Sequence, residues 1–539
     1  MPERSSRGEV ATVRSRSRSR SKPRRPSFPR VKSSQRLIRT ISAEFGSTGD
    51  VSVVSQDMDH LTLEGGSHEV IEVPFVKATL DSTLPNSYLK QDILNLIQAL
   101  KIQKWYKKSS GSTLDTESLK ITKITGAMTN AIFKVEYAGL PSLLLRIYGP
   151  NVESIIDRDY ELQVLARLSS HKVGPSLFGC FTNGRFEQFL ENSTTLNKND
   201  IRNWRTSQRI ARRMKELHVG VPLNSTEIKN GSINWTRIYK WLQKIEQSEW
   251  SKKTSNLESV LLSKDWEFFK YSVNKYHEWL DKNRKSSQHL AFCHNDAQYG
   301  NLLFTAPVVP LSTTTTSSSI SSTAPSLFPT SSNISLDEII HPSIHEQAQD
   351  SKLVVIDFEY SGASPPAYDL ANHLSEWMCD YNCSEPYKSN EAKFPNKEEM
   401  LNFIYSYASH KRPTEDRSID DEVREIYNEI IKERACVSLH WSLWGIIQSG
   451  ELDAPKDEKT VEEGPGGERY VITVMDEDEV TSIDSSSSIE GVDIDSFENL
   501  LYATEKMQLF WGDLVQFGLV SPEELPKSAK LKYLDTKMI

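Results

Sequence analysis

The segment FCHNDAQYGNLLF, residues 292–304, places an acid, an amide and an apolar run in a fixed order. Asp296 lies two positions after His294, and Asn301 follows five positions later, directly before the apolar residues. In phosphoryl transfer, a loop Asp orients the attacking hydroxyl and accepts its proton, while a loop Asn holds the metal on the nucleotide phosphates. A lone His-x-Asp is common by chance, so the whole spacing is what predicts a kinase-type loop here.

A second acid follows another apolar run. The residues LVVI, 353–356, are typical of a short buried strand, and Asp357 stands at its end. Taken alone, such an Asp more often caps a turn, but the upstream loop favours a role on the phosphate-bound metal. The next residues depart from the DFG pattern of protein kinases, and no APE segment follows. We therefore predict a small acceptor molecule and not a protein substrate.

Composition narrows the class of protein. The chain has 539 residues, a net charge of −9 and no apolar run of membrane-spanning length or signal-peptide type. This predicts a soluble, intracellular protein with a cytoplasmic location. The five cysteines show no metal-ligand spacing, so free thiols in a reducing compartment are expected.

The charge is concentrated at the N-terminus. Residues 1–40 hold 13 Lys/Arg against two acids, so the remainder carries about −20. The Arg/Ser repeat at 14–20 cannot form a core, and residues 1–70 are predicted to be a disordered regulatory tail. The repeat could bind RNA electrostatically, but no RNA-binding module follows, so no nucleic-acid partner is expected. Ser27 resembles a target of a basophilic protein kinase.

Two further segments look like insertions. Residues 306–350 are rich in Ser, Thr and Pro, and residues 451–495 are acidic. Both are predicted to be disordered, with 470–474 as a candidate short strand. The first insertion would loop out of a hairpin-like connection between the two motif segments.

The ordered body begins at residue 71, with an N-terminal nucleotide-binding lobe at 71–190 and a C-terminal lobe at 191–539. Helical spacing of apolar residues predicts a helix capped by Asn86 or Ser87. Residues 120–135 read as strand, small-residue turn and strand. The turn could cover phosphates through its backbone N–H groups, although Gly126 alone is more often a simple hairpin glycine.

The next elements complete a kinase-like order. An apolar strand at 142–149 contains Arg146, and a buried arginine needs a partner. The helix predicted at 153–169 supplies Glu161 as that partner, an arrangement comparable to the Lys–Glu pair of protein kinases. A structural ion pair is the alternative. A strand at 184–190 could lead into a hinge that contacts adenine.

Several of these segments together resemble one family. The motifs are GAMTN (126–130), LLLRIYG (143–149), GRFEQFLE (184–191), HNDAQYGNLLF (294–304), VVIDFEYSG (354–362) and YDLANHLSEWMCDYN (368–382). They resemble the choline/ethanolamine kinase family, and the wider pattern is most similar to its fungal members. The resemblance implies a two-lobed, protein-kinase-like α/β (α+β) fold, use of ATP and Mg²⁺, and a homodimer.

The resemblance also implies roles for single residues. Asp296 would be the base, Asn301 and Asp357 would hold Mg²⁺, and His294 would maintain the shape of the loop. The residues implied in nucleotide binding are Thr125, Gly126, Ala127, Met128, Thr129, Asn130, Ala131, Arg146, Glu161, Gln188, Leu190 and Gln298.

A quaternary ammonium group is recognised by aromatic faces and a nearby acid. The family pattern assigns such a pocket to Glu359, Tyr360, Glu376, Tyr381, Trp441, Trp444 and Tyr502. Trp441 and Trp444 share a helix face, and taken alone such a pair is more often part of the core.

The implied reaction transfers the γ-phosphate of ATP to choline, giving phosphocholine, the first step of phosphatidylcholine synthesis by the CDP-choline route. Ethanolamine as preferred acceptor is the alternative within the same chemistry. A non-catalytic or RNA-associated protein that acts through the Arg/Ser tail is the alternative from another class.

Overall fold

The structure is a computed structural model, and its described residues belong to one compact unit, residues 52–539. The described residues are 59–64, 70–106 except 83, 114–124, 130–148, 158–284 except 172, 289–305, 327, 335–413, 417–452, 460–463, 469–472 and 497–539.

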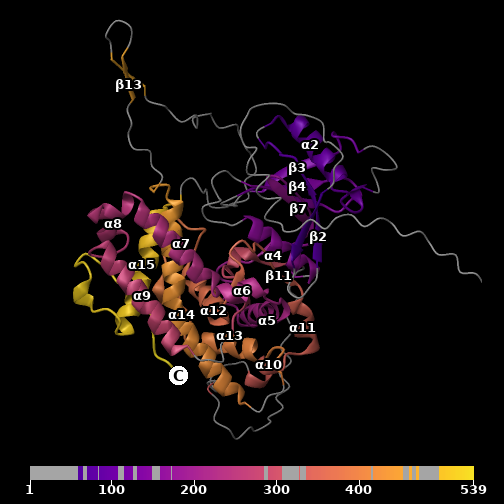
Figure 1. Cartoon of the computed structure of the whole chain (residues 1–539). Coiled ribbons are helices and arrows are strands. Elements are labelled where there is room, and N and C mark those ends of the chain that lie inside the picture. The colour runs from indigo at the N-terminus through magenta and orange to yellow at the C-terminus, as the bar shows by residue number, and fades with distance from the viewer. Residues whose placement is uncertain are drawn as a thin grey trace, which may run out of the picture. The chain divides into compact units, whose positions relative to one another are not determined.

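A seven-stranded sheet forms the first half of the described chain (Figure 1). Strand β5 is apolar except for Arg146 and is buried along most of its length, so the sheet buries a face against helices. The two strands predicted within 120–135 are confirmed by the antiparallel pair β3–β4, and residues 125–129 between them lie outside the described residues. In spatial order the strands are β1 (Asp59–Glu64), β2 (Val70–Val76), β6 (Leu177–Phe181), β7 (Gly184–Gln188), β5 (Leu143–Tyr148), β4 (Asn130–Glu136) and β3 (Lys120–Ile124).

Two helices belong to this part of the chain, α2 (Asn86–Ala99) and α4 (Arg158–Ser170). Helix α2 turns its apolar side, including Ile93 and Ile97, into a core that it shares with the sheet. The predicted cap is wrong: Pro85 occupies the N-cap position, and no side-chain cap hydrogen bond forms. Proline is suited to a helix start because it fixes φ and has no N–H to satisfy.

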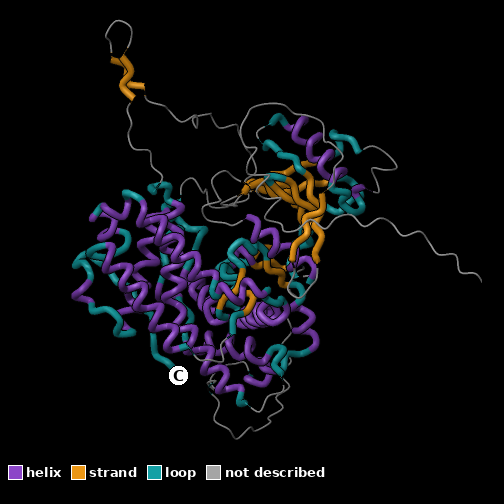
Figure 2. The backbone as a smooth tube through the Cα atoms, viewed as in Figure 1, coloured by secondary structure: helices purple, strands orange, loops and turns teal. Residues whose placement is uncertain are grey.

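The rest of the chain is mainly helical (Figure 2). Its small sheets are β8 (Thr194–Thr195) with β10 (Leu302–Phe304) and β11 (Leu353–Val355), β9 (Ala291–Cys293) with β12 (Gly362–Ser364), and β13 (Thr460–Glu463) with β14 (Arg469–Ile472). Its α-helices are α5 (Trp204–Gly220), α6 (Ser225–Asn230), α7 (Ile233–Gln247), α8 (Thr254–Ser259), α9 (Trp266–Asn283), α10 (Leu336–Ile340), α11 (Ile344–Asp350), α12 (Pro366–Ser375), α13 (Lys397–Ser409), α14 (Ile419–Gln448) and α15 (Asn499–Gln516). Short 3₁₀ turns are η2 (Trp250–Lys252), η3 (Tyr299–Asn301), η4 (Glu376–Met378), η5 (Glu391–Lys393) and η7 (Pro522–Glu524).

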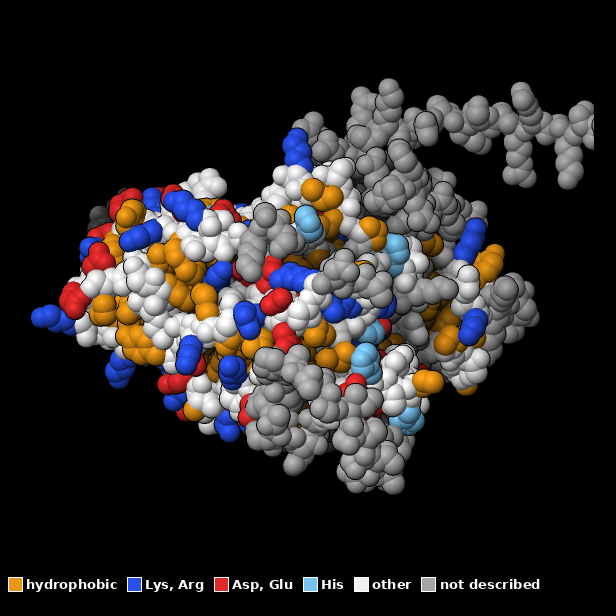
Figure 3. Space-filling view, turned by 90° about the horizontal axis from the view of Figure 1, so that it is seen from below, with side chains coloured by type: hydrophobic (Ala, Val, Ile, Leu, Met, Phe, Trp, Pro, Cys, Tyr) orange, Lys and Arg blue, Asp and Glu red, His pale blue; other side chains and the backbone are white. Residues whose placement is uncertain are grey.

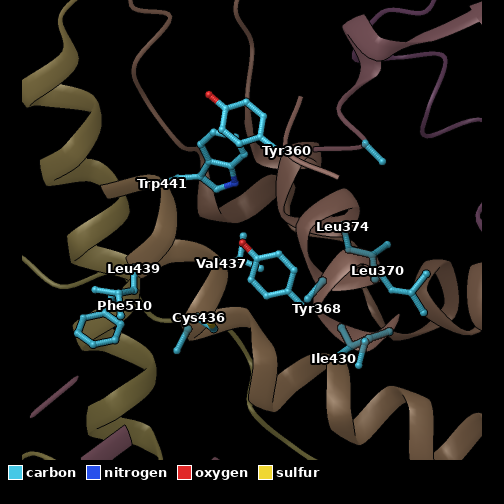
Figure 4. Close-up of a cluster of buried hydrophobic side chains, with 14 of the residues drawn as sticks. Tyr360, Tyr368, Leu370, Leu374, Ile430, Cys436, Val437, Leu439, Trp441 and Phe510 are labelled. Carbon is cyan, nitrogen blue, oxygen red and sulfur yellow. The ribbon is translucent and has the colours of Figure 1, made fainter. Parts of the chain in front are cut away.

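Helix α14 is the centre of the helical part, because it packs against α7, α12, α13 and α15. It is buried on nearly all sides over its second half, as expected for a helix surrounded by others. Gly445 permits the close approach of α15, since a Cβ there would lie 2.8 Å from the carbonyl oxygen of Asn499. Figure 4 shows Leu370 and Leu374 of α12, Leu439 of α14 and Phe510 of α15 gathered in this core.

The prediction of disorder for 306–350 is wrong for its last part, where α10 and α11 form. Ile339 is fully buried, and two acids of α11 form buried ion pairs with α5. Arg209 contacts Glu346 at 2.9 Å, and Arg212 contacts Asp350 at 2.6 Å. Composition could not reveal this, because the arginines lie more than a hundred positions away. The hairpin-like connection is confirmed by the antiparallel pairing of β10 with β11.

The other two predicted disordered segments also contain strands. Strand β1 lies inside 1–70 and pairs antiparallel with β2, so the tail prediction is wrong for Asp59–Glu64. Within 451–495, β14 overlaps the candidate strand at 470–474 and pairs with β13. Residues 1–58, with the Arg/Ser repeat and Ser27, lie outside the described residues.

The length and polarity of the helices decide whether the chain could cross a membrane. None of the described helices is both long enough and apolar enough to cross a bilayer. On the face drawn in Figure 3, basic and acidic side chains are interspersed among apolar ones. All five cysteines are free thiols, as the sequence predicts.

We predict that Asp350→Ala lowers the free energy of unfolding by about 3–5 kcal/mol, because it leaves the Arg212 guanidinium buried without its carboxylate. Asp337→Ala is the control, since Asp337 is 81% exposed in the neighbouring helix and its loss should cost less than about 0.5 kcal/mol. Urea unfolding of both variants measures the difference. Equal stabilities would contradict the anchoring of α11 by this pair.

Candidate active site

The loop that carries Asp296 runs between two short strands. It leaves β9, makes the turn η3 and enters β10. Strand β9 pairs with β12, and β10 pairs with β11, so both ends of the loop are fixed by antiparallel ladders. Asn295 has φ of 64°, a left-handed conformation that Asn tolerates better than most residues. The local sequence therefore suits the sharp bend directly before Asp296.

Asp369 on α12 holds this bend in place. Its two carboxylate oxygens accept the backbone N–H groups of His294 at 2.9 Å and of Asn295 at 2.8 Å. Its Oδ2 also lies 2.9 Å from His218 Nε2, whose other ring nitrogen lies 2.8 Å from the Tyr407 hydroxyl. Burial opposes the charge, but these hydrogen bonds hold the pKa of Asp369 below its ordinary value.

The same region contains groups of the type that bind metals. His218, Cys293 and Asp369 place ligand-type atoms within 4.8 Å of one another. Both ring nitrogens of His218 are already engaged, and Cys293 Sγ donates to the Ser364 carbonyl at 3.4 Å. We therefore interpret this group as a hydrogen-bonded support behind the loop.

His294 and Asn295 link the loop to its neighbours. His294 Nε2 donates to the carbonyl of Ile356 at 2.9 Å, and Nδ1 accepts the N–H of Asp296 at 3.2 Å. Asn295 Nδ2 donates to the Tyr360 carbonyl at 3.0 Å. Burial lowers the pKa of His294, so its ring is neutral, and these contacts give it the shape-holding position that the sequence predicts.

Asp296 and Asn301 lie side by side, as their spacing predicts. Asn301 Nδ2 donates to Asp296 Oδ2 and to the Asp296 carbonyl, both at 2.9 Å. Burial raises the pKa of Asp296 well above its usual range, and Glu376, Asp357 and Glu359 raise it further. Four carboxylates thus converge on one region, which favours the presence of a cation there.

Asp357 lies near Asp296 and Asn301. It also contacts the seven-stranded sheet through Arg146. It has φ of 64°, and its Oδ1 lies 3.2 Å from a guanidinium nitrogen of Arg146 on β5. The predicted pairing of Arg146 with Glu161 is wrong, because Glu161 forms its ion pair with Arg185 on β7 at 2.8 Å. Arg146 also approaches Glu187 at 4.0 Å.

The sequence indicates Arg185 and Glu187 only as part of the predicted hinge strand. Their alternation with apolar residues was the available signal, since β7 is buried from Gly184 to Glu187. Two arginines and two glutamates of neighbouring elements therefore form one buried network.

Of the other residues predicted to bind the nucleotide, those that the structure describes do not gather into one group. Thr125 to Thr129 lie outside the described residues, while Asn130 and Ala131 begin β4. Gln188 is exposed at the end of β7, and its Oε1 accepts the N–H of Ser176 at 3.3 Å. Leu190 follows, half-buried. Gln298 lies in the loop itself, where its Oε1 accepts the N–H of Gly300 at 2.7 Å.

Four predicted aromatic residues form a continuous group. The ring of Trp441 lies 5.2 Å from that of Tyr360 and 5.7 Å from that of Trp444, and Trp444 lies 5.8 Å from Tyr502. All three pairs meet edge to face, a favourable arrangement for aromatic rings. Trp444 Nε1 donates to the Tyr360 hydroxyl at 2.7 Å. We call these four residues the aromatic cluster.

Acids lie beside the aromatic cluster. Tyr381 donates its hydroxyl to Glu376 Oε2 at 2.9 Å. Glu359 precedes Tyr360, and the carbonyl oxygens of both accept hydrogen bonds from Arg237 of α7, at 3.3 and 2.7 Å. Arg237 has no recognisable motif in the sequence, so only the structure identifies it as a support for this segment.

The arrangement of a loop acid bonded to an amide, a second acid beside it and a strand arginine defines a kinase-like protein. The solved choline kinase from Cryptosporidium parvum Iowa II has a similar fold, with a TM-score of 0.50 at 17% identity over 80% of this chain and 97% of its own. The family profile described as Choline/ethanolamine kinase matches residues 121–511, and the one described as Choline kinase N terminus matches residues 66–112.

Curated relatives agree with this match. A choline kinase from Saccharomyces cerevisiae is 51% identical over 571 residues, covering 97% of each chain. An ethanolamine kinase from the same organism is 36% identical over 496 residues, covering 88% of this chain and 85% of its own. The chain belongs to the choline/ethanolamine kinase family, which confirms the resemblance seen in the sequence.

The loop also rests on a neutral histidine, which gives a pH prediction. His373 Nδ1 donates to the Ala297 carbonyl at 2.8 Å, and burial lowers the pKa of His373 to about 4. The unfolded chain takes up this proton near pH 6.5, so stability should fall as pH drops from about 6.5 to 4.

His373→Gln should reduce this fall in the free energy of unfolding by about 3 kcal/mol. Urea unfolding at several pH values measures it, with His345→Gln, an exposed position, as the control. An unchanged pH dependence in His373→Gln would contradict the neutral, buried state of this ring.

Proposed function

We propose that the protein is an ATP-dependent choline kinase that transfers the γ-phosphate of ATP to the hydroxyl of choline. The observation that carries this proposal is the aromatic cluster, which adjoins the carboxylate-rich region around Asp296. The 51% identical relative is a choline kinase, which supports the same acceptor.

The residues around Asp296 suit a magnesium nucleotide. Mg²⁺ prefers carboxylate and carbonyl oxygens, and the raised pKa of Asp296 reflects a local excess of negative charge. Asp357 and Asn301 would hold the ion. Because Asn301 Nδ2 is committed to Asp296, its carbonyl oxygen is the atom it would offer. When bound, the ion neutralises charge on the phosphates.

The remaining residues would position the nucleotide. Arg146 already reaches Asp357 from the sheet and can also contact phosphate oxygens, while the Glu161–Arg185 pair fixes the network behind it. Gln188 and Leu190 would flank adenine at the end of β7. The turn Thr125–Ala131 and Gln298 are proposed to lie near the phosphates.

Asp296 would accept the proton of the acceptor hydroxyl as the phosphoryl group is transferred. Its hydrogen bond from Asn301 and the fixed bend at Asn295 orient this carboxylate before substrate arrives. The protein thus contributes mainly positioning and charge compensation.

The aromatic cluster would bind the quaternary ammonium group. Its methyl groups donate no ordinary N–H bonds, so attraction comes from ring faces and nearby negative charge. Tyr360, Trp441, Trp444 and Tyr502 supply the rings. Glu359, Glu376 and Tyr381 surround them and supply charge and support.

Ethanolamine is the second candidate acceptor, favoured by the carboxylate of Glu376 beside the rings and by the 36% identical ethanolamine kinase. A primary ammonium could donate N–H bonds to such a group. A cytoplasmic location, a homodimer and phosphorylation of serines such as Ser27 stay predictions from the sequence.

The purified full-length protein should phosphorylate choline with ATP and Mg²⁺ at a kcat/KM at least several-fold above that for ethanolamine. Steady-state assays with both acceptors measure this preference. Asp296→Ala should lower kcat by about 10²–10⁴-fold and leave the Kd for ATP nearly unchanged. An ethanolamine preference would reverse the acceptor assignment, and near-normal turnover of Asp296→Ala would contradict the role of Asp296.

Trp444→Leu should lower kcat/KM for choline by about 30-fold, because a desolvated cation–π contact is worth about 2 kcal/mol. The KM for ATP should stay within about twofold. Trp279→Leu, which removes a half-buried tryptophan of α9 stacked on Phe517 at the C-terminal end of α15, is the matched control. A similar loss of choline turnover in both variants would indicate a general packing defect in place of a lost binding face.

A further inference from the structure

A buried lysine lies directly behind the aromatic cluster. Lys506 on α15 is only 3% exposed. Its ammonium nitrogen lies 4.9 Å from the ring centroid of Tyr502 and 3.3 Å from the sulfur of Cys379. A lysine this deeply buried requires negative charge or ring faces around it. No motif in the sequence indicated this residue.

The carboxylate of Glu376 is one of the groups that raise the pKa of this lysine. The Cys379 sulfur lies between them, 3.9 Å from Glu376 Oε1, and the other carboxylate oxygen accepts the Tyr381 hydroxyl. Burial raises the pKa of Glu376, while Lys506 and then Tyr381 oppose that rise. Each oxygen of Glu376 therefore already has a partner, the Tyr381 hydroxyl for Oε2 and the Cys379 thiol for Oε1.

This arrangement divides the charges around the aromatic cluster into two groups. Lys506 opposes the rise that burial causes in the pKa of Glu376, whereas Glu376, Asp357 and Glu359 add to the corresponding rise in the pKa of Asp296. One face of Tyr502 is occupied by Lys506, and that face cannot also receive a substrate cation. The attraction for a cation from Glu376 is thus weakened by a fixed internal charge.

We propose that Lys506 is a specificity-determining residue that draws Glu376 away from the substrate and so makes the pocket favour a quaternary over a primary ammonium group. This inference rests on the proposed function. A quaternary cation needs ring faces and diffuse negative charge, whereas a primary ammonium is strongly hydrated and needs hydrogen-bond acceptors to replace its water. The hydrogen bond from Tyr381 and the thiol of Cys379, which Lys506 contacts, occupy Glu376 and so remove such an acceptor.

The test compares kcat/KM for ethanolamine and choline in Lys506→Met, Lys506→Gln and Lys506→Arg. Both neutral variants should raise the ethanolamine-to-choline ratio at least about tenfold, the value of one charge-assisted hydrogen bond. Lys506→Arg keeps the charge, and its ratio should stay within about twofold of the wild type. A ratio that is unchanged in the neutral variants overturns the proposal.

Glu376→Gln provides a second test, which does not require Lys506 to be replaced. If Glu376 is directed at Lys506, both acceptors should lose kcat/KM by similar factors. A loss for ethanolamine more than about tenfold greater than for choline would show that Glu376 already binds the ammonium directly, and it would overturn the proposal. In the double variant Glu376→Gln/Lys506→Met, the shift in ratio caused by Lys506→Met should disappear.

These outcomes are separable from failure of the proposed function. The wild-type protein tests that function by its turnover of choline, whereas the Lys506 variants test only the ratio between two acceptors. Thermal unfolding of each variant verifies folding before the ratios are compared. If neither neutral Lys506 variant folds, the Glu376→Gln ratio decides the proposal by the criterion above.

Discussion

The carboxylate of Asp369 accepts two successive backbone N–H groups of the loop, at His294 and Asn295, from inside the helical core. The left-handed Asn295 that follows from this contact turns the chain so that Asp296 and Asn301 meet. His218 forms a hydrogen bond with this buried carboxylate, and α12 holds Asp369 as a rigid support. Without a charged acceptor there, two backbone donors would be buried unpaired, at a cost of about 1–3 kcal/mol each.

Around this loop the protein balances an excess of buried carboxylates with few cations. Arg146 reaches Asp357 from the sheet, and Lys506 compensates Glu376 from α15. Among the described residues, the Asp296 carboxylate accepts a hydrogen bond from the Asn301 amide, and Glu376, Asp357 and Glu359 keep its environment negative. The buried pair of Arg434 with Asp513, away from this loop, matches one cation with one acid, whereas the loop has more acids than cations, a pattern typical of functional sites.

The sequence predicts those features that depend only on residues close together along the chain. The spacing of Asp296 and Asn301, the strand before Asp357 and the strand-turn-strand at 120–135 are all set within a few residues. Partners set by tertiary packing could not be predicted in this way. Arg146 pairs with Asp357, which lies 211 positions away in the sequence. Helices α10 and α11 are held in place by arginines of α5. The family resemblance supplied the aromatic residues, because the spacing of the two tryptophans alone favoured a core position.

Trp441 and Trp444 are core residues, as their spacing alone indicates, and they also belong to the aromatic cluster, whose cation-binding role stays a proposal. The two side chains are 6% exposed and belong to the main hydrophobic cluster, yet their rings also face Tyr360 and Tyr502 across the aromatic cluster. Their indole N–H groups are fixed by Asn372 and Tyr360, so the rings cannot rotate freely. A cation site built from core residues is preorganised, which reduces the entropy lost on binding. The same rigidity means that selectivity must be tuned by charges behind the rings, where Lys506 lies.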